Sequence, residues 1–268
     1  MASRWKWHGR HAARAAALLA LALGGCVSPR VGDEIIVAGR AVPAGTRVIS
    51  WKGAGGLDAY RTAQIDEMGT PLSYGARRNR DGQPITAGDL EALRGTVEQI
   101  VLHYDGIGDS RECFEHLAER QLSAHFLVDI DGTIYQTLDL QERAYHATVA
   151  NNRSIGIEIA NLGAFPAAEA DTAELRDPVR GAVHGIELAQ SHFTSAQYTA
   201  LAKLIDALCR TFPRIERRVP RDANGDVVMS KLPDDELANF RGILGHFHIQ
   251  ENKVDPGPAF QWELILPR

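Results

Sequence analysis

Residues Gln99-Ile100-Val101-Leu102-His103-Tyr104 form a short apolar run. Runs of about four to eight apolar residues are typical of strands that are buried on both faces. Asp109 follows as a candidate N-cap, and Glu112, three residues later, completes the usual pattern of a helix start. This stretch therefore predicts a buried strand that leads into a helix, the unit from which α/β folds are built.

A β-hairpin is predicted after this helix. Residues 125–130 and 133–137 are rich in β-forming residues, and Asp131-Gly132 between them is a strong signal for a hairpin turn. Two more apolar runs, 155–160 and 243–247, predict further buried strands.

A long helix is predicted between the last two of these strands. Thr194 and Gln197 form a capping box, and apolar residues then recur at helical spacing as far as Phe212. Because strands alternate with helices, we expect an α/β fold with a mixed central β-sheet flanked by helices.

The composition is that of a folded globular protein. The 268 residues include 29 Lys+Arg and 34 Asp+Glu, with a formal net charge of −5 and a charged fraction of 24%. This balance is not that of a disordered chain, and its acidic sign offers no electrostatic reason to bind nucleic acid. The three Cys are too few for a scaffold held together by disulfides.

The N-terminus has the order of a secretory signal. Basic residues up to Arg14 precede the apolar run Ala15–Leu23, and small residues follow it. This run is well short of the roughly 20 residues that a transmembrane helix needs, so we expect export rather than a permanent span.

The end of this signal, Leu23-Gly24-Gly25-Cys26, resembles the lipobox of bacterial lipoproteins. The resemblance implies that residues 1–25 are removed and that Cys26 carries a lipid anchor to a membrane. Val27 then implies the periplasmic face of the outer membrane if the cell is Gram-negative. The alternative is an ordinary signal peptide that happens to end near a Cys.

We expect two parts after the signal. Residues 26–95 are rich in Gly, Pro and Arg, which predicts a tether and an irregular, partly β lead-in. Residues 96–268 hold the predicted strands and helices of one main domain. Within it, the composition of residues 162–191 and 213–239 predicts long surface loops, and loops of such length are usually functional or disordered.

The basic clusters are interpreted as solvated surface. Arg77, Arg78 and Arg80, and the arginines of residues 214–221, have few aromatic residues between them, unlike a nucleic-acid-binding patch.

Two cysteines remain in the exported chain. Cys113 and Cys209 each fall on a predicted helix beside apolar residues. The sequence leaves open whether they pair in the oxidising compartment or stay as buried free thiols.

Three residues of metal-ligand type stand at predicted strand ends or in the loop that follows one: His103, His246 and Asp255. Two imidazoles and one carboxylate, with a fourth position left for water, are the ligand set of a catalytic zinc. The common zinc-protease and zinc-finger patterns, HExxH and paired CxxC, are absent from the sequence. Spacing alone is a weak signal, because a His at a strand end is more often structural.

The sequence motifs around these residues are more specific. They resemble those of the zinc-dependent N-acetylmuramoyl-L-alanine amidases, whose fold is shared with peptidoglycan recognition proteins. The resemblance covers roughly residues 97–262. Four stretches match in order: Ile100-Val101-Leu102-His103-Tyr104; Ser123-Ala124-His125-Phe126-Leu127-Val128, which leads to Asp131-Gly132-Thr133-Ile134-Tyr135-Gln136; Ser154-Ile155-Gly156-Ile157-Glu158-Ile159; and Gly245-His246 with Lys253-Val254-Asp255-Pro256-Gly257-Pro258-Ala259-Phe260.

The resemblance implies a role for each matched residue. One Zn²⁺ per chain is held by the three candidate ligands. Glu158 is the carboxylate that activates the attacking water, and Lys253 is the cation that stabilises the oxyanion. His146 is expected to contact the substrate near the metal. The implied substrate is peptidoglycan or a muropeptide, cleaved at the amide between N-acetylmuramic acid and L-alanine.

The other histidines are given structural or surface roles. We expect His125 to pack or hydrogen-bond in the core, and we expect His116, His184 and His192 to face solvent. His248 remains an alternative ligand, because residues i and i+2 of a strand share a face and it would then lie beside His246. Asp255 is preferred, since the family match runs through it.

Two other functions compete with amide hydrolysis at this bond. One is a non-catalytic lipoprotein that binds peptidoglycan, but such a protein is expected to lose a ligand or the water-activating carboxylate. The other is the same zinc chemistry on a different amide. Neither function involves nucleic acid.

Overall fold

In the computed structural model, the described residues are 32–170 and 175–266. The predicted signal (residues 1–25) and the predicted lipidation site Cys26 lie outside them. All described residues fall within one compact unit, Val31–Arg268. Residues 32–95 thus belong to the same compact unit as the described residues from 96 onward.

The chain alternates strands and helices, as the sequence predicts. The strands are β1 (Gly32–Val37), β2 (Arg40–Ser50), β3 (Tyr74–Ala76), β4 (Gln99–Tyr104), β5 (Phe126–Val128), β6 (Ile134–Gln136), β7 (Glu142–Ala144), β8 (Ser154–Ile159), β9 (Ala164–Pro166), β10 (Val179–Val183), β11 (Ile186–Gln190) and β12 (Gly242–Gly245). The α-helices are α1 (Ala59–Thr62), α2 (Leu90–Thr96), α3 (Ser110–Glu119), α4 (Ser195–Thr211) and α5 (Asp234–Asn239). Short 3₁₀ helices are η1 (Thr148–Ala150), η2 (Ala167–Glu169), η3 (His246–His248) and η4 (Trp262–Leu264).

A mixed seven-stranded sheet forms the centre of the fold, in the order β1-β2-β6-β5-β8-β4-β12. β8 pairs in parallel with both β4 and β5, and β4 pairs in parallel with β12. β5 and β6 form the predicted antiparallel hairpin around Asp131-Gly132. This arrangement confirms the expected α/β class with a mixed sheet flanked by helices.

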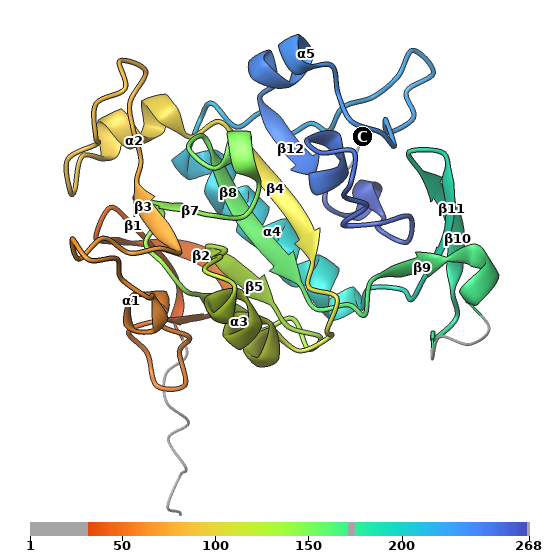
Figure 1. Ribbon diagram of the computed structural model, residues 1–268, viewed down its shortest axis with the longest axis horizontal. Coiled ribbons are helices and arrows are strands. Elements are labelled where there is room, and N and C mark those ends of the chain that lie inside the picture. The colour runs from red at the N-terminus through yellow and green to blue at the C-terminus, as the bar shows by residue number, and fades with distance from the viewer. Residues whose placement is uncertain (1–31, 171–174, 267–268) are drawn as a thin grey trace, which may run out of the picture. The chain divides into compact units, whose positions relative to one another are not determined.

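The two faces of this sheet have different surroundings. Ile155, Ile157 and Ile159 of β8 are buried in the core cluster that contains the apolar face of α4, the long helix opened by the predicted capping box. Gly156 and Glu158 point to the opposite face, because successive side chains of a strand alternate. Figure 1 shows α4 behind the sheet and α3 in front of it, so the front face carries the polar residues of β8.

The predicted partly β lead-in contains β1 and β2, and both strands belong to the main sheet. Their turn, Ala38-Gly39, has both residues at positive φ, 50° and 74°. The carboxylate of Asp139 accepts hydrogen bonds from both backbone N–H groups of this turn, at 2.7 Å each. Asp139, about 100 residues away in the sequence, thus stabilises a turn that the local sequence does not predict.

Residues 162–191 also differ from the loop that their composition predicts. They contain β9, β10 and β11, which form a separate three-stranded antiparallel sheet in the order β10-β11-β9. Residues 213–239 are mostly irregular, as expected, and end in the short helix α5.

The basic cluster around Arg77 predicted a surface position for this residue. This prediction is wrong, because Arg77 is fully buried. Its guanidinium donates hydrogen bonds to the backbone carbonyls of Leu140, Asn151, Asn152 and Ser154, at 2.7–3.2 Å. Burial lowers the pKa of Arg77 to about 9. The side chain ties the lead-in to the segment that precedes β8, which explains why a cation is retained in the interior.

Cys113 and Cys209 are free thiols, so the alternative of a disulfide between them is set aside. Cys113 of α3 is buried with Leu127 on the front of the sheet. Cys209 belongs to α4, which covers the back. The sheet separates the two sulfur atoms.

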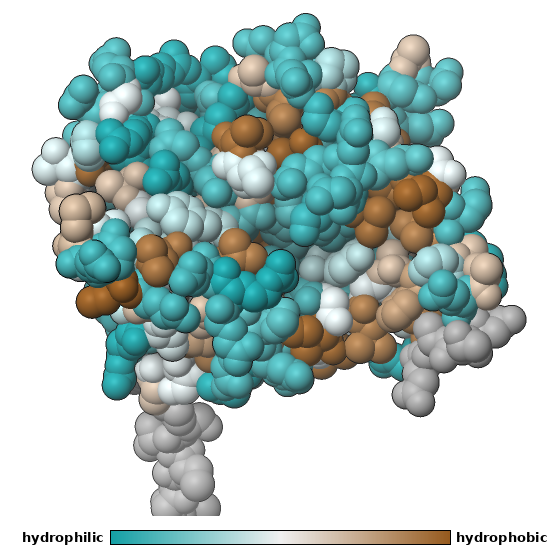
Figure 2. Space-filling view, in the orientation of Figure 1, coloured by the Kyte–Doolittle hydropathy of each residue, from teal (hydrophilic) through white to brown (hydrophobic). Residues whose placement is uncertain are grey.

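Within residues 32–170 and 175–266, none of the helices combines the length and apolar character needed to cross a membrane. The face shown in Figure 2 is mainly hydrophilic, and its hydrophobic residues lie in small separate groups.

Replacing the buried guanidinium tests how much this interior cation stabilises the fold. We expect Arg77→Met to lower the free energy of unfolding by about 3–5 kcal/mol, because four buried carbonyls lose their donor. Arg78→Met, at an exposed neighbour, is the matched control and should change stability by no more than about 0.5 kcal/mol. Urea denaturation measures both, and equal costs for the two variants would contradict the role given to Arg77.

Candidate functional site

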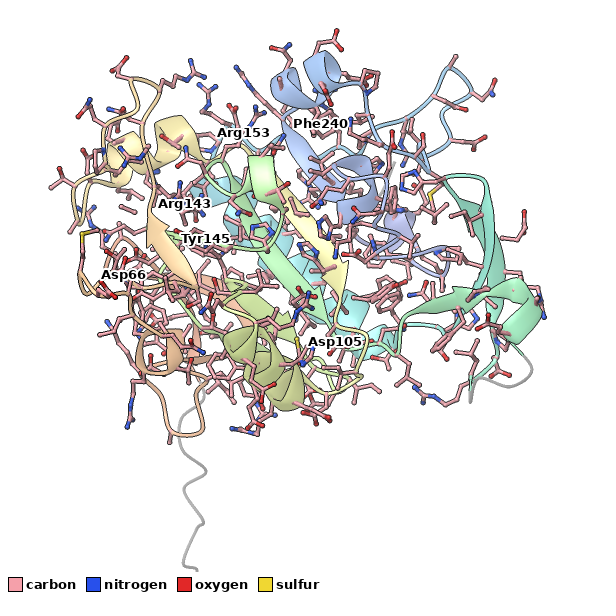
Figure 3. All side chains as sticks on the ribbon, in the orientation of Figure 1. Asp66, Asp105, Arg143, Tyr145, Arg153 and Phe240 are labelled. Atoms are coloured by element: carbon pink, nitrogen blue, oxygen red, sulfur yellow. The ribbon has the colours of Figure 1, made fainter. Side chains whose placement is uncertain are left out.

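The candidate metal ligands lie at one edge of the sheet, where the parallel strands β4, β8 and β12 end. Arg153 and Phe240 mark the amino-terminal edge of these strands, and Asp105, just after β4, marks the carboxyl-terminal edge (Figure 3). His103 is the penultimate residue of β4, and the register pairs it with Glu158 of β8. Both side chains therefore reach the front face at the same level.

His246 stands directly after β12 and begins the 3₁₀ helix η3, so the expected strand to residue 247 ends two residues earlier. This shortening removes His248 as a ligand, because the two side chains no longer follow the alternation of a strand. His248 is buried elsewhere: its Nδ1 accepts from the N–H of Gly245, and its Nε2 donates to the carbonyl of Val228.

The structure brings the three candidate ligands together. The Oδ2 atom of Asp255 lies 2.8 Å from Nδ1 of His103 and 3.0 Å from Nδ1 of His246, and the two Nδ1 atoms are 3.0 Å apart. All three side chains are buried. Among the described residues, this is the one group of three such side chains whose ligand atoms lie within 4.8 Å of one another.

The triangle of ligand atoms fits a metal ion in size and in charge. Ligand atoms about 2.0–2.1 Å from a tetrahedral zinc are about 3.3 Å apart, close to the edges of this triangle. Burial and the neighbouring His246 lower the pKa of His103 to about 4. Burial alone would raise the pKa of Asp255, but the two histidines lower it overall. A neutral imidazole and an anionic carboxylate are the protonation states that metal binding requires.

Glu158 lies on the central strand β8 and is largely buried in the same cleft. Burial raises its pKa well above the ordinary value, and the charges of Asp255 and Asp105 add to this shift. Lys253 and Arg120 act in the opposite direction. A carboxylate with a raised pKa can both accept and return a proton near neutral pH. Because β8 has a paired strand on each side, Glu158 does not lie on a solvated edge strand.

Lys253 lines the cleft, which has a volume of about 330 Å³. Its backbone is held from two sides, because its N–H donates to the carbonyl of Gln250 and its carbonyl accepts from Nε2 of His184 at 2.9 Å. The positive charge of Lys253 influences the pKa of both His103 and Glu158. The structure thus places this cation at the candidate metal site.

His146 also borders the cleft, where its ring lies against Gly156 of β8. The nearest ring atom would be 2.6 Å from a Cβ at position 156, so only glycine leaves room for this ring. Nδ1 of His146 lies 3.1 Å from Nε2 of His103. The sequence predicted a substrate contact here, and the structure shows that His146 contacts the candidate metal ligand His103 directly.

Gln190 of β11 supports the loop that carries Asp255, a role that no local sequence pattern indicates. Its Nε2 donates to the carbonyl of Pro256 at 2.9 Å, and its Oε1 accepts from the N–H of Ala259 at 3.0 Å. The Gln190 side chain also fills the space beside Gly257, where a Cβ would come within 2.2 Å of Oε1. The small sheet of residues 162–191 therefore buttresses the candidate metal loop.

Four other histidines were assigned from the sequence. His125 is fully buried and accepts a hydrogen bond from the N–H of Gly156, which confirms its core role. His116 and His192 are exposed, as predicted. His184 is half-buried against the carbonyl of Lys253, so the prediction that it faces solvent is wrong.

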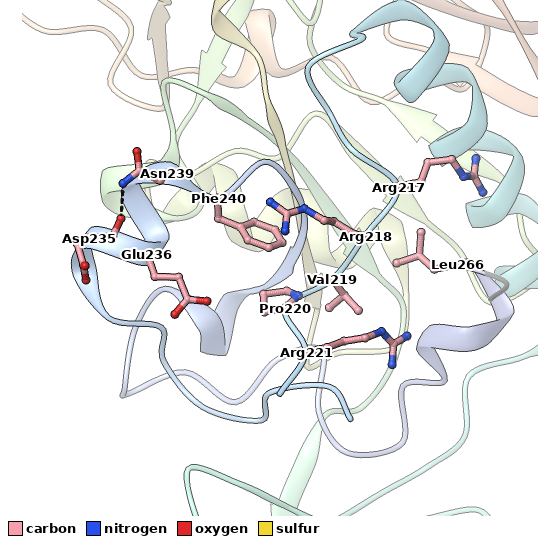
Figure 4. Close-up of a pocket in the computed structure, with 10 residues that line it drawn as sticks. All are labelled: Arg217, Arg218, Val219, Pro220, Arg221, Asp235, Glu236, Asn239, Phe240 and Leu266. Atoms are coloured by element: carbon pink, nitrogen blue, oxygen red, sulfur yellow. Dashed lines mark hydrogen bonds between the residues drawn. The ribbon is translucent and has the colours of Figure 1, made fainter. Parts of the chain in front are cut away.

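A second cavity of about 750 Å³ lies between residues 217–221 and α5, near the amino-terminal edge of the parallel strands (Figure 4). Arg217 pairs with Asp206, and Arg221 pairs with Glu263 at 2.7 Å. The lining contains neither His nor Cys, so the chemistry described above belongs to the first cleft.

Comparison with protein families gives a match over residues 93–258 to the model described as N-acetylmuramoyl-L-alanine amidase. Curated relatives include two proteins named 1,6-anhydro-N-acetylmuramyl-L-alanine amidase AmpD. The one from Haemophilus influenzae is 26% identical over 57% of this chain and 61% of its own length. The one from Escherichia coli K12 is 28% identical over 56% of this chain and 59% of its own length. The matched region thus spans about three fifths of these relatives.

Among solved structures, the chain is similar to the N-acetylmuramyl-L-alanine amidase AmiD of E. coli in complex with an anhydromuramyl tripeptide substrate. The sequence identity is 23%, the TM-score is 0.44, and the match covers 63% of this chain and 56% of that chain.

The close approach of His146 to β8 makes position 156 a sensitive test of the site. We expect Gly156→Ala to displace the imidazole and to lower the free energy of unfolding by about 1–3 kcal/mol, because the added methyl overpacks a buried contact. Gly95→Ala, on α2 with open space around its Cβ, is the matched control and should be neutral or stabilising by up to about 1 kcal/mol. Thermal and urea unfolding of both variants provide the measurement, and an unchanged Gly156→Ala protein would contradict the packing described.

Proposed function

Because the chain belongs to the N-acetylmuramoyl-L-alanine amidase family, we propose that it is a zinc-dependent enzyme that hydrolyses the amide between N-acetylmuramic acid and L-alanine. The substrate class is peptidoglycan or the muropeptides derived from it. The observation that carries this proposal is the convergence of His103, His246 and Asp255 with Glu158 in one cleft.

The three ligand side chains would hold one Zn²⁺ through Nδ1 of each histidine and Oδ2 of the carboxylate, the atoms that already face one another. When bound, the ion supplies a Lewis acid that polarises a carbonyl oxygen and lowers the pKa of a water molecule. The ligand set of two His and one carboxylate leaves a position open for these groups, which is typical of catalytic rather than structural sites.

Glu158 is the proton carrier of the proposed reaction. Its carboxylate accepts a proton from the attacking water as the oxygen bonds to the lactyl carbonyl carbon. It then delivers this proton to the amine of L-alanine as the C–N bond breaks. The burial that raises its pKa suits both steps, because the group must hold the proton between them.

Lys253 stabilises the negative charge that develops on the carbonyl oxygen. Lys253 is half-buried and lines the cleft beside the three buried ligands, where a charge interacts more strongly than in bulk water. Such stabilisation accelerates hydrolysis because the oxygen carries this charge only in the transition state.

The main alternative is a protein that binds peptidoglycan without cleaving it. Such a protein has no need of the water-activating carboxylate, yet Glu158 and all three ligands are retained and assembled. The names of the curated relatives favour muropeptides with a 1,6-anhydro end as one substrate.

We expect Glu158→Gln to reduce turnover at least about 100-fold while zinc is retained, because the amide cannot accept the proton. The assay is mass spectrometry of the products from defined muropeptides, with and without a 1,6-anhydro end and with and without a chelator. The expected product is the free stem peptide, formed only by the metal-loaded protein.

Glu115→Gln, an exposed change on α3, is the matched control and should keep full activity. Zinc-loaded wild-type protein that leaves every muropeptide intact would overturn the proposed activity. Cleavage at another amide would show that the enzyme does not act on the bond between N-acetylmuramic acid and L-alanine.

We also propose that the exported protein is anchored by a lipid on Cys26, which the Leu23-Gly24-Gly25-Cys26 motif supports. We expect Cys26→Ser to move the protein from the membrane fraction to the soluble fraction, because several buried acyl chains are needed for stable anchoring. Fractionation and radiolabelled fatty acid incorporation measure this. Cys113→Ser is the control, and a Cys26→Ser protein that still incorporates the label would contradict the anchor.

A further inference from the structure

We propose that His146 and Ser154 form a hydrogen-bond relay that keeps His103 in the tautomer whose Nδ1 is free to bind the metal. This inference rests on the metal site of the proposed function and assigns His146 a positioning role. Three observations carry it: the identity of each donor in the relay, the burial of Ser154 and His103 at its two ends, and the absence of a spare nitrogen on the His146 ring.

Ser154 determines which group donates in each hydrogen bond of the relay. The hydroxyl of Ser154 donates its one hydrogen to the carbonyl of Ala150, at 2.7 Å. Its Oγ can therefore only accept from Nε2 of His146, which lies 3.3 Å away. This contact places the proton of the His146 ring on Nε2.

The tautomer of His146 in turn determines the tautomer of His103. With Nε2 protonated, Nδ1 of a neutral His146 carries a lone pair and accepts from Nε2–H of His103, at 3.1 Å. A neutral His103 protonated on Nε2 has its own lone pair on Nδ1. That atom faces Asp255 and His246. The relay thus selects the metal-binding tautomer over the alternative.

A neutral imidazole carries one proton, so each hydrogen bond in the chain determines the next.

The surrounding backbone holds the relay in place. Oδ1 of Asn151 accepts from the N–H groups of both His146 and Ala147, at 3.1 and 2.6 Å. Gly156 provides the space for the imidazole, and Ser154 is completely buried at the start of β8. The partners of His146 are therefore held by the fold itself, and substrate is not needed to order them.

Both nitrogens of His146 are engaged within the protein, so the ring has none left to hydrogen-bond a substrate. This separates a positioning role from the substrate contact that the sequence predicted. The second ligand has a comparable partner: Nε2 of His246 donates to Oε1 of Gln250 at 2.8 Å. Partners of this kind orient metal ligands and affect affinity by about 10- to 100-fold when they are removed.

The test is the zinc affinity of Ser154→Ala, measured by competition with a chromophoric chelator. This substitution removes the acceptor of His146 Nε2–H and lets the ring adopt the other tautomer. We expect zinc affinity to fall at least about 10-fold, with KM for muropeptide unchanged at saturating zinc. Ser110→Ala, which removes another buried serine hydroxyl outside the relay, is the matched control and should bind zinc like the wild type.

Two further measurements test the relay even if Ser154→Ala folds poorly. His146→Gln, whose amide oxygen can accept from His103, should retain more zinc affinity than His146→Leu. Two-bond ¹⁵N–¹H spectra of the zinc-loaded wild-type protein should show His146 and His103 protonated on Nε2.

An Nδ1-protonated His146, or a Ser154→Ala protein with normal zinc affinity, would overturn the relay. Tight zinc binding without muropeptide cleavage would overturn only the proposed activity, because the relay concerns the metal. A wild-type protein that binds no zinc would overturn both.

Discussion

The parallel pairing of β4 with β8 is the constraint on which the rest of the site depends. Its register places His103 beside Glu158, and strand alternation turns both side chains to the face opposite α4. The candidate metal ligand and the proposed proton carrier thus lie on neighbouring strands inside the main sheet. A slip of β8 by one residue would turn Glu158 toward the apolar core, so the isoleucines of β8 that pack against α4 also hold Glu158 at the site.

The remaining site residues lie on loops, and distant segments hold these loops. Asp255 depends on Gln190 of β11, a strand of the segment that composition alone assigns to the surface. His146 depends on a segment clamped by the buried Arg77. Loops positioned by a rigid scaffold commonly carry catalytic groups. Here the scaffold includes parts of the chain that the family match does not cover, since Arg77 precedes residue 93.

Sequence patterns were reliable where local rules decide the outcome. The capping box at Thr194 and the N-cap Asp109 begin helices as predicted. Sequence patterns did not predict features that depend on a hydrogen-bond partner far away in the sequence. The Ala38-Gly39 turn needs Asp139, and Arg77 becomes an interior cation because four carbonyls accept its hydrogen bonds. Composition cannot reveal such partners, because they are far apart in the sequence.

The sequence by itself determined the α/β class, the family and the identity of the candidate ligands, because strand periodicity and short motifs are local properties. Only the tertiary structure decided that His248 lies apart from the candidate ligands, that the free thiols Cys113 and Cys209 lie on opposite sides of the sheet, and that His146 contacts the candidate ligand His103. These outcomes depend on distances and hydrogen-bond directions between residues that come together only when the chain folds.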